Sequence, residues 1–331
     1  MDGKIDLRSP LRAAGLALAL LLSATGALSQ TVLRAWNTHP EGYPVTEAMK
    51  SFAQEIESGT KGKYRVQVYS DAVLGDQVKA IAMLKSGEID LAEFAGPQLS
   101  NAAPGLKAFN LPFLFTDAAH MFRYLDGKVG DRLGEQLKAS GYVPLGWYNG
   151  GARSFYCAGK TPAKLDQLAG LRIRVPQSEV FTEMVKLLGG TPVEVPYKDV
   201  LAAFQQGRID CAEGNLVSFE STGHYKLARH MLQDNHMISP EVLVASTALW
   251  SKLTEAERQL FKDAGIRSAR LMRELWEKRT AAARANVAKD GVVIVPVKDA
   301  SPYVRKMAPL YNTYMADPAV RGDLFAIIGN Q

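Results

Sequence analysis

A seven-residue pattern occurs twice in this chain, 120 positions apart. Gly-x-Ile-Asp-x-Ala-Glu spans residues 87–93 and again residues 207–213. An apolar-periodic stretch precedes each copy, so each copy predicts a helix, a glycine stop and a short buried strand. A further candidate strand lies upstream of each copy, at residues 64–69 and 192–195. Two strand-helix-strand units favour two lobes with a cleft at the strand ends. Chance recurrence of a common helix-glycine-strand phrase is the alternative.

The N-terminal residues have the pattern of a secretory signal peptide. Three basic residues precede an apolar run at residues 13–22, and Ala27-Leu28-Ser29 forms a small-x-small cleavage site. We therefore expect residues 1–29 to be removed, with an uncleaved anchor as the alternative. The apolar run is shorter than the roughly 20 residues that a membrane-spanning helix needs, so we expect a soluble mature protein. The 331-residue length and the 47% hydrophobic content suffice for two domains.

Charge and cysteine content restrict the possible partners. The formal net charge is +5, and basic residues are scattered among acidic ones without a like-charge run, so we expect no nucleic acid partner. Cys157 and Cys211 both fall in candidate strands of the second lobe. An oxidising compartment allows them to form a disulfide, and two buried free thiols are the alternative. Neither has a second cysteine or a histidine at ligand spacing, so we expect no metal site.

The remaining patterns predict an α/β protein with two lobes. Each lobe is expected to hold a mixed, mostly parallel sheet flanked by helices. A capping box of Thr254 and Glu257 opens a helix that continues to about Lys289, long enough to span both lobes. The chain is expected to cross between lobes at residues 149–151 and in a returning strand at residues 242–249. The predicted lobes are residues 31–150 plus 240–280 and residues 151–239 plus 281–331.

No catalytic constellation is recognisable. The five histidines lack any catalytic or metal-binding spacing, and nucleophile and phosphate-binding motifs are absent from the sequence. We therefore expect no catalytic residue, no enzyme activity and no cofactor. His39 and His236 fall at strand ends and could face a cleft, although structural hydrogen bonding is the more common role for such residues.

Arg174 is the strongest candidate for ligand binding. It lies near the end of a predicted buried strand at residues 171–175, and Pro176 follows this strand. A buried guanidinium needs an anion, and its planar fork suits a carboxylate. Arg153, at the start of a neighbouring candidate strand, could provide further donors. The alternative is a structural ion pair between Arg174 and an internal acid such as Glu194 or Glu213.

Several motifs, in the order in which they occur along the chain, resemble those of one family of receptors. They are Leu74-Gly75, Gly87-x-Ile89-Asp90, Phe109-x-Leu111-Pro112-Phe113-Leu114-Phe115, Gly170-Leu171-Arg172-Ile173-Arg174-Val175-Pro176 and Ala202-x-x-Gln205-x-Gly207-x-x-Asp210-x-x-Glu213. Together they resemble the solute receptors of tripartite ATP-independent periplasmic (TRAP) transporters, of the C4-dicarboxylate-binding type. The resemblance implies the two-lobed fold of periplasmic binding proteins. It also implies a periplasmic receptor that closes on an organic acid and delivers it to the small and large TRAP membrane subunits. A receptor of an ATP-driven importer, a sensor subunit and a secreted enzyme on the same fold are the alternatives.

The resemblance also implies roles for individual residues. Arg174 matches the arginine that grips the ligand carboxylate, Arg153 matches a frequent second contact, and Tyr197 matches an aromatic residue that packs on the ligand. The other candidates for the pocket are Trp36, Asn37, Gln77, Glu93 to Gly96, Gly214, Asn215 and His236.

Two departures bear on the ligand. Many members of the family have Glu-Asn where this chain has Glu213-Gly214-Asn215, so Gly214 cannot provide the asparagine side chain and Asn215 is the candidate to replace it. Glu93 would repel a second carboxylate unless it is protonated or paired. We therefore expect a monocarboxylate that carries hydroxyl, amino or aromatic groups rather than a plain C4-dicarboxylate.

Overall fold

The computed structural model describes residues 30–159 and 162–329, so the signal peptide expected at residues 1–29 lies outside the described residues. The described strands form one mixed sheet in the order β2-β1-β3-β8-β4-β7-β5-β6, and β9 also pairs with β8. Their bounds are β1 Thr31–Trp36, β2 Tyr64–Tyr69, β3 Leu91–Ala95, β4 Tyr142–Cys157, β5 Arg172–Val175, β6 Thr191–Glu194, β7 Cys211–Asn215, β8 His230–Ser246 and β9 Val293–Pro296.

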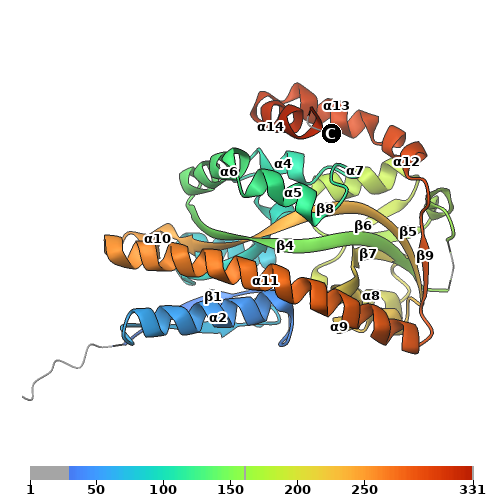
Figure 1. The fold of residues 1–331 in the computed structure, drawn as a ribbon. Coiled ribbons are helices and arrows are strands. Elements are labelled where there is room, and N and C mark those ends of the chain that lie inside the picture. Colours follow the sequence, from blue (N-terminus) through green and yellow to red (C-terminus); the bar gives the residue numbers. More distant parts are fainter. Residues whose placement is uncertain (1–29, 160–161, 330–331) are drawn as a thin grey trace, which may run out of the picture.

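Helices cover both faces of this sheet (Figure 1). Those of eight residues or more are α2 Pro44–Gly59, α3 Gln77–Ser86, α5 Ala118–Leu125, α6 Lys128–Ala139, α7 Glu179–Leu187, α11 Glu255–Lys289, α13 Ala308–Ala316 and α14 Pro318–Ile328. The shorter ones are α4 Leu106–Phe109, α8 Val200–Gln205, α9 Leu216–Ser221, α10 Thr247–Trp250 and α12 Ser301–Lys306. Among the described helices, none combines the length and the apolar character that crossing a membrane requires.

Two long strands join the lobes and confirm the predicted two-lobed α/β fold. Strand β4 pairs antiparallel with β8 over almost its whole length. Beside them, β1, β2 and β3 run parallel in one lobe, whereas β5, β6 and β7 run parallel in the other. The register of the β4–β8 pair shifts between Asn149 and Ala152, at the first predicted crossover. The residue boundaries predicted for the lobes stay a prediction.

The second predicted crossover needs a correction. We expected a strand over residues 242–249, but β8 begins at His230, and residues 247–250 form α10. Asparagine and proline are uncommon inside strands, so Asn235 and Pro240 hide the first part of β8 from a prediction based on sequence. The structure keeps the strand by accepting a left-handed backbone at Asn235 (φ 47°), whose amide donates to Ser154 Oγ at 3.2 Å. Tertiary hydrogen bonding thus overrides the local preference.

The two sequence repeats have the same local structure. Gly87 and Gly207 both adopt left-handed φ angles, +77° and +63°, which lets the chain leave the helix and enter the next strand. Asp90 accepts a hydrogen bond from the backbone amide of Arg34 at 2.8 Å, and Asp210 accepts one from Arg172 at 2.9 Å. The repeat therefore fixes each short buried strand to its parallel neighbour.

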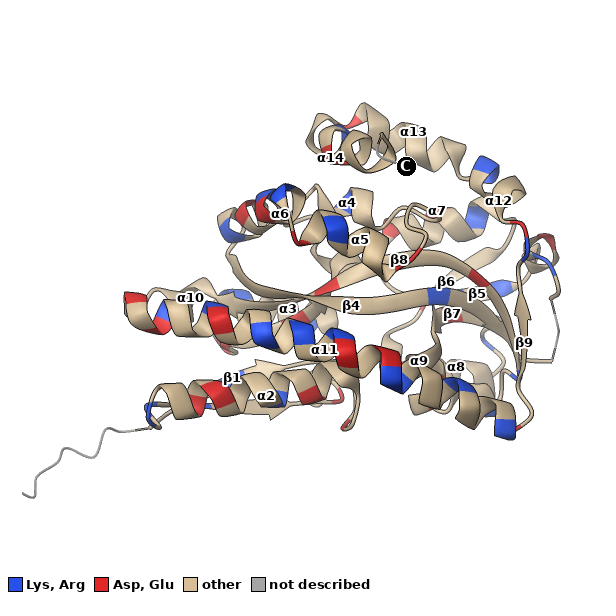
Figure 2. Cartoon of the chain, in the orientation of Figure 1, with Lys and Arg blue, Asp and Glu red and all other residues tan. Residues whose placement is uncertain are grey.

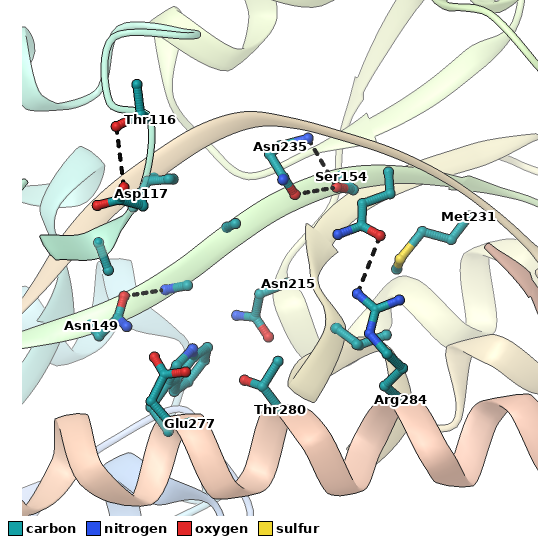
Figure 3. Close-up of a pocket in the computed structure, with 17 residues that line it drawn as sticks. Thr116, Asp117, Asn149, Ser154, Asn215, Met231, Asn235, Glu277, Thr280 and Arg284 are labelled. Carbon is teal, nitrogen blue, oxygen red and sulfur yellow. Dashed lines mark hydrogen bonds between the residues drawn. The ribbon is translucent and has the colours of Figure 1, made fainter. Parts of the chain in front are cut away.

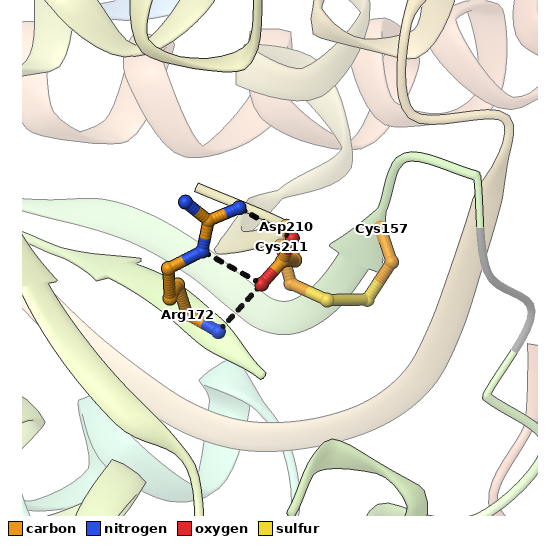
Figure 4. The surroundings of a disulfide bond; sticks show 4 residues. All are labelled: Cys157, Arg172, Asp210 and Cys211. Atoms are coloured by element: carbon orange, nitrogen blue, oxygen red, sulfur yellow. Dashed lines mark hydrogen bonds and ion pairs between the residues drawn. A yellow bond between two sulfur atoms is a disulfide. The ribbon is translucent and has the colours of Figure 1, made fainter. Parts of the chain in front are cut away.

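The second repeat also carries the disulfide. Cys157 at the end of β4 lies directly opposite Cys211 at the start of β7, and the two sulfurs are bonded at 2.05 Å (Figure 4). Beside this bond, Arg172 reaches both carboxylate oxygens of Asp210. The outer end of the second lobe is thus fixed covalently and by an ion pair.

The long helix α11 confirms the prediction of a helix that spans both lobes. Thr254 and Glu257 form the expected capping box at its start. The helix packs on α2 and β4 in one lobe and on α9 in the other, and it lies along the length of the molecule (Figure 1). A side chain at Gly265 would meet the Leu145 carbonyl oxygen at 2.4 Å, so glycine permits the close approach of α11 to β4. Acidic and basic residues are interspersed along the helix (Figure 2).

The C-terminal helices pack across the other side of the sheet, above α4, α5 and α7 (Figure 1). Helix α13 contacts α7, whereas α14 contacts α4. Arg132 on α6 binds the buried Asp323 of α14, and the Tyr124 hydroxyl donates to the Ile327 carbonyl at 3.2 Å. This segment therefore ties the second lobe to helices that follow β3.

Candidate ligand-binding site

A cavity lies between the lobes, at the carboxyl ends of the parallel strands. From the first lobe it is lined by Thr38 and His39 after β1, Gln77 at the start of α3, and Gln98 after β3. From the second lobe it is lined by Arg174 at the end of β5, Tyr197 after β6, and Glu213, Gly214 and Asn215 at the end of β7. Open parallel sheets bind ligands at this edge, because loops from several strands converge there.

Arg174 presents a buried cation to this cavity. Its side chain is 5% exposed, and its Nε donates to the Val195 carbonyl at 2.9 Å. Within the described chain this is the one hydrogen bond of the guanidinium, and its nearest acid is Glu213, 3.8 Å from Nη1. The alternative predicted from the sequence was a structural ion pair between Arg174 and an internal acid such as Glu213. In the structure, only this long contact joins Arg174 and Glu213. Burial lowers the pKa of Arg174, and the charge of Glu213 offsets this effect only in part.

Glu213 is bound instead by Arg153. Nε and Nη2 of Arg153 donate to the two carboxylate oxygens at 2.6 and 2.7 Å. Behind this pair, His236 lies 3.5 Å from Glu213 through Nε2 and 3.0 Å from Asp234 through Nδ1. Burial alone would raise the pKa of Glu213, but Arg153 and His236 outweigh it and lower the pKa to about 2. Arg153 thus lines the cavity with its charge largely neutralised.

Asn215 and Gly214 form the second-lobe wall. The Asn215 Oδ1 accepts from the Ser218 amide at 2.7 Å and caps α9, while its Nδ2 donates to the Gly150 carbonyl at 3.0 Å. The side chain is therefore already engaged by backbone groups. A Cβ at Gly214 would meet Tyr156 no closer than 3.6 Å, so the missing side chain leaves space in the cavity.

Four predicted residues lie behind the cavity lining. Trp36 is buried, with its indole donating to the Gly75 carbonyl at 3.1 Å, and His236 belongs to the network behind Glu213. Asn37 accepts through Oδ1 from the His39 amide at 2.9 Å, so it orients His39. Glu93 is 1% exposed and neighbours Glu241.

Sequence reasoning missed several lining residues, among them Tyr156, Phe181, Ser218, Ser239 and Glu241. His224 also lines the cavity, and its Nδ1 lies 2.9 Å from the Tyr156 hydroxyl. Burial, aided by Arg174, lowers the pKa of His224 to about 3, so its ring is neutral at pH 7. The strand-end rule could have located Thr38, but no sequence signal marks Glu241, which lies inside β8.

Contacts between the lobes close the cavity. The Tyr43 hydroxyl of α2's N-terminal flank lies 3.0 Å from the Ser218 hydroxyl of α9. At the mouth, Gln98 Nε2 donates to the Gln177 carbonyl at 3.2 Å. Both contacts join first-lobe residues to second-lobe residues, so the two lobes are in direct contact in this structure.

A second cavity lies on the far side of β4 and β8, against α11 (Figure 3). It includes Asn149, Ser154, Asn235, Glu277 and Arg284 in its wall. Arg284 is exposed, and its Nη2 donates to Gln233 Oε1 at 3.2 Å. Water can solvate this charge, so Arg284 does not need a ligand anion. The inner cavity with Arg174 is therefore the better candidate for binding an organic acid.

Three side chains at the first-lobe end of the inner cavity have the geometry of a possible cation site. The side chains of His39, Glu93 and Glu241 each offer one atom that could bind a metal ion, and these atoms all lie within 4.8 Å of one another. This grouping brings together a loop and two strands far apart in sequence, which spacing rules cannot reveal.

Comparison with known proteins agrees with this geometry. Residues 36–317 match the model of the family described as bacterial extracellular solute-binding protein, family 7. A solute-binding protein of Chromohalobacter salexigens is 34% identical over 305 residues, covering 92% of this chain and 91% of that protein.

Two solved structures have the same fold at similar identity. A TRAP periplasmic solute-binding protein of Roseobacter denitrificans with bound β-D-glucuronate has a TM-score of 0.87 at 36% identity, covering 90% of this chain and 99% of that one. One from Sulfitobacter with bound β-D-galacturonate has a TM-score of 0.87 at 33% identity, covering 91% and 100%. The resemblance seen in the sequence motifs is thus confirmed: this chain belongs to family 7 of the bacterial extracellular solute-binding proteins, the receptors of TRAP transporters, and not to a family of enzymes.

Proposed function

We propose that this chain binds a hexuronate, a cyclic sugar acid with one carboxylate, in the cavity between its lobes. The observation that carries the proposal is Arg174, a buried guanidinium that faces the cavity and whose nearest acid is 3.8 Å away. A ligand carboxylate would complete its charge and hydrogen bonding. The bound glucuronate and galacturonate of the two similar structures support the same ligand class here.

The rest of the lining suits a polyhydroxylated ring. Polar groups from both lobes surround the space, including Thr38, Gln77, Ser218 and Ser239. Tyr197, a predicted ligand contact, and Tyr156 supply flat apolar surface beside them. Gly214 leaves room that an asparagine would fill, in keeping with a ligand bulkier than a C4-dicarboxylate.

Binding would proceed in two steps. The carboxylate docks on Arg174, and closure of the lobes then adds first-lobe groups and excludes water, which strengthens the ionic contact. The hinge lies in β4 near Gly150 and Gly151 and in β8 near residues 237–241. The closed receptor acts in the periplasm and delivers the acid to the small and large TRAP membrane subunits.

Calorimetric titration of the mature protein with D-glucuronate, D-galacturonate and succinate tests the ligand class. Arg174→Ala should weaken uronate binding at least about a hundredfold, because a charge-assisted pair is lost in a dry site. Arg172→Ala is the matched control: this arginine lies on the same strand but is exposed and pairs with Asp210, so binding should persist. Preference for succinate, or equal binding by the Arg174→Ala variant, would refute the proposal.

Delivery needs its own test. Proteoliposomes that contain the paired TRAP membrane subunits should take up uronate under an ion gradient only when the receptor is added. Uptake that requires ATP would instead support a receptor of an ATP-driven importer.

A further inference from the structure

His39, Glu93 and Glu241 form a buried polar cluster that the Arg174 site does not use. Their residues are 4%, 1% and 7% exposed. His39 Nε2 lies 3.5 Å from Glu241 Oε1, a long contact. Both ring nitrogens of His39 and one carboxylate oxygen each of Glu93 and Glu241 lack a hydrogen-bond partner within the described chain. A buried polar group that lacks a hydrogen-bond partner is unfavourable. The cluster is therefore incomplete without a further group.

The cluster is open to the ligand cavity on one side. His39 and Glu241 line the cavity, whereas Glu93 lies behind them on β3. Arg174 lines the same cavity from the second lobe. A ligand held at one end by Arg174 therefore presents its other atoms to His39 and Glu241.

His39 is held rigidly in this position. Its ring stacks on Tyr43 with centroids 3.9 Å apart and planes within 2°. Its backbone amide donates to Asn37, and its carbonyl accepts from Thr46 Oγ1 at 3.2 Å. Such support is typical of a side chain set to make a directional hydrogen bond.

The charges of the cluster restrict what it can accept. Burial, and then repulsion from Glu241, raise the pKa of Glu93 well above 4.5, so Glu93 holds a proton. Glu241 presents carboxyl oxygens to the cavity, and His39 presents an imidazole ring whose nitrogens can bind hydroxyl groups. A ligand hydroxyl can both donate and accept, whereas a second ligand carboxylate can only accept and would face Glu241.

We propose that His39 and Glu241, backed by Glu93, bind the ring hydroxyl groups of the ligand and exclude acids with a second carboxylate at that end. This inference rests on the proposed function, since it takes the ligand carboxylate to lie on Arg174. It names the pair that sets specificity for sugar acids over dicarboxylates.

Calorimetry with three acids tests this subsite. D-Glucuronate has the carboxylate, the ring and the hydroxyls. Tetrahydropyran-2-carboxylate has the carboxylate and the ring without hydroxyls, and D-glucarate is an open-chain acid that keeps hydroxyls and has a second carboxylate. The wild type should bind D-glucuronate at least about a hundredfold more tightly than either analogue. Glu241→Gln should lose at least about thirtyfold for D-glucuronate, little for the hydroxyl-free acid, and should gain affinity for D-glucarate.

Substitutions of His39 and of an exposed glutamate provide a further test and a control. His39→Gln, which retains a donor and an acceptor, should lose less affinity for D-glucuronate than His39→Ala. Glu88→Gln, an exposed glutamate of the same lobe, should bind all three acids like the wild type. Thermal melting of each variant checks that it is folded.

The outcomes separate the two proposals. If the wild type binds no uronate, the proposed function fails. If Arg174→Ala abolishes uronate binding but Glu241→Gln weakens all carboxylates equally, only the subsite is refuted. Elemental analysis that finds one metal ion per chain in the wild type and none in Glu241→Gln would also overturn the proposal, because the cluster would then be a cation site.

Discussion

Glu93 and Glu213 occupy the same position of the two repeats, and each is 1% exposed, yet the pKa of Glu93 is raised and that of Glu213 is lowered. Glu213 accepts two hydrogen bonds from Arg153, which hold it ionised. Burial, and then repulsion from Glu241, raise the pKa of Glu93 and favour its protonated form. The repeat therefore specifies the backbone of both lobes, while the partners across the sheet decide the chemistry of each copy.

This contrast predicts unequal effects of the same substitution. Glu213→Gln should lower the free energy of unfolding by about 3–5 kcal/mol, because it leaves the largely buried Arg153 cation without its anion. Glu93→Gln should cost much less, because a neutral amide replaces a neutral carboxyl of similar shape. Urea denaturation at pH 7 measures both. Equal losses in the two variants would mean that both glutamates are ionised in the folded protein.

His236 predicts how stability depends on pH. Burial alone would lower its pKa, but Asp234 and Glu213 outweigh burial and raise it from 6.5 to about 9. A raised pKa stabilises the fold fully below pH 6.5, and this contribution is lost as the pH rises through about 9. The loss should amount to roughly 3 kcal/mol.

Urea denaturation in steps from pH 6 to pH 10 checks this prediction. The difference in unfolding free energy between the wild type and His236→Gln should shrink across that range. A difference that stays constant would show that His236 is neutral in the folded protein.

Much of the site was predictable because its residues stand at strand ends. Arg174 lies near the end of β5, Asn215 ends β7 and Tyr197 comes soon after β6. The alternation and glycine signals around these strands are visible in the sequence. The local pattern failed at β8, where Asn235 and Pro240 suggested a break. Glu241 was missed with this strand, because only pairing with β3 brings it near Glu93.

The role of Arg153 was equally beyond the sequence. An arginine at the start of this strand fits two roles equally well, as a donor to the ligand or as the ion-pair partner of Glu213. Only the register of β4 and β7, which sets Arg153 opposite Asn215 and Phe155 opposite Glu213, brings the guanidinium against the carboxylate.

Gly214 predicts a loss of affinity without a loss of stability. A methyl group in Gly214→Ala would meet Tyr156 at an ordinary 3.6 Å and project into the cavity. Uronate affinity should fall about tenfold or more, while the urea midpoint should change little. Gly151→Ala is the matched contrast: its φ is +74° and its Cβ would lie 2.3 Å from Trp276, so the fold itself should be destabilised. Unchanged affinity in Gly214→Ala would place the ligand away from this wall.

The disulfide predicts the opposite separation, a loss of stability without a loss of affinity. Cys157 and Cys211 are 54 positions apart, and closing a loop of that length should stabilise the fold by about 4 kcal/mol on chain-entropy grounds. The bond lies at the start of β7, whereas the cavity residues Glu213 to Asn215 lie at its other end. The double variant Cys157→Ser/Cys211→Ser should therefore unfold at lower urea concentration but bind uronate within about twofold of the wild type. Dithiothreitol should lower the urea midpoint of the wild type and leave the double variant unaffected. A large drop in affinity in the folded double variant would show that the disulfide sets the position of the second-lobe wall, and not only its stability.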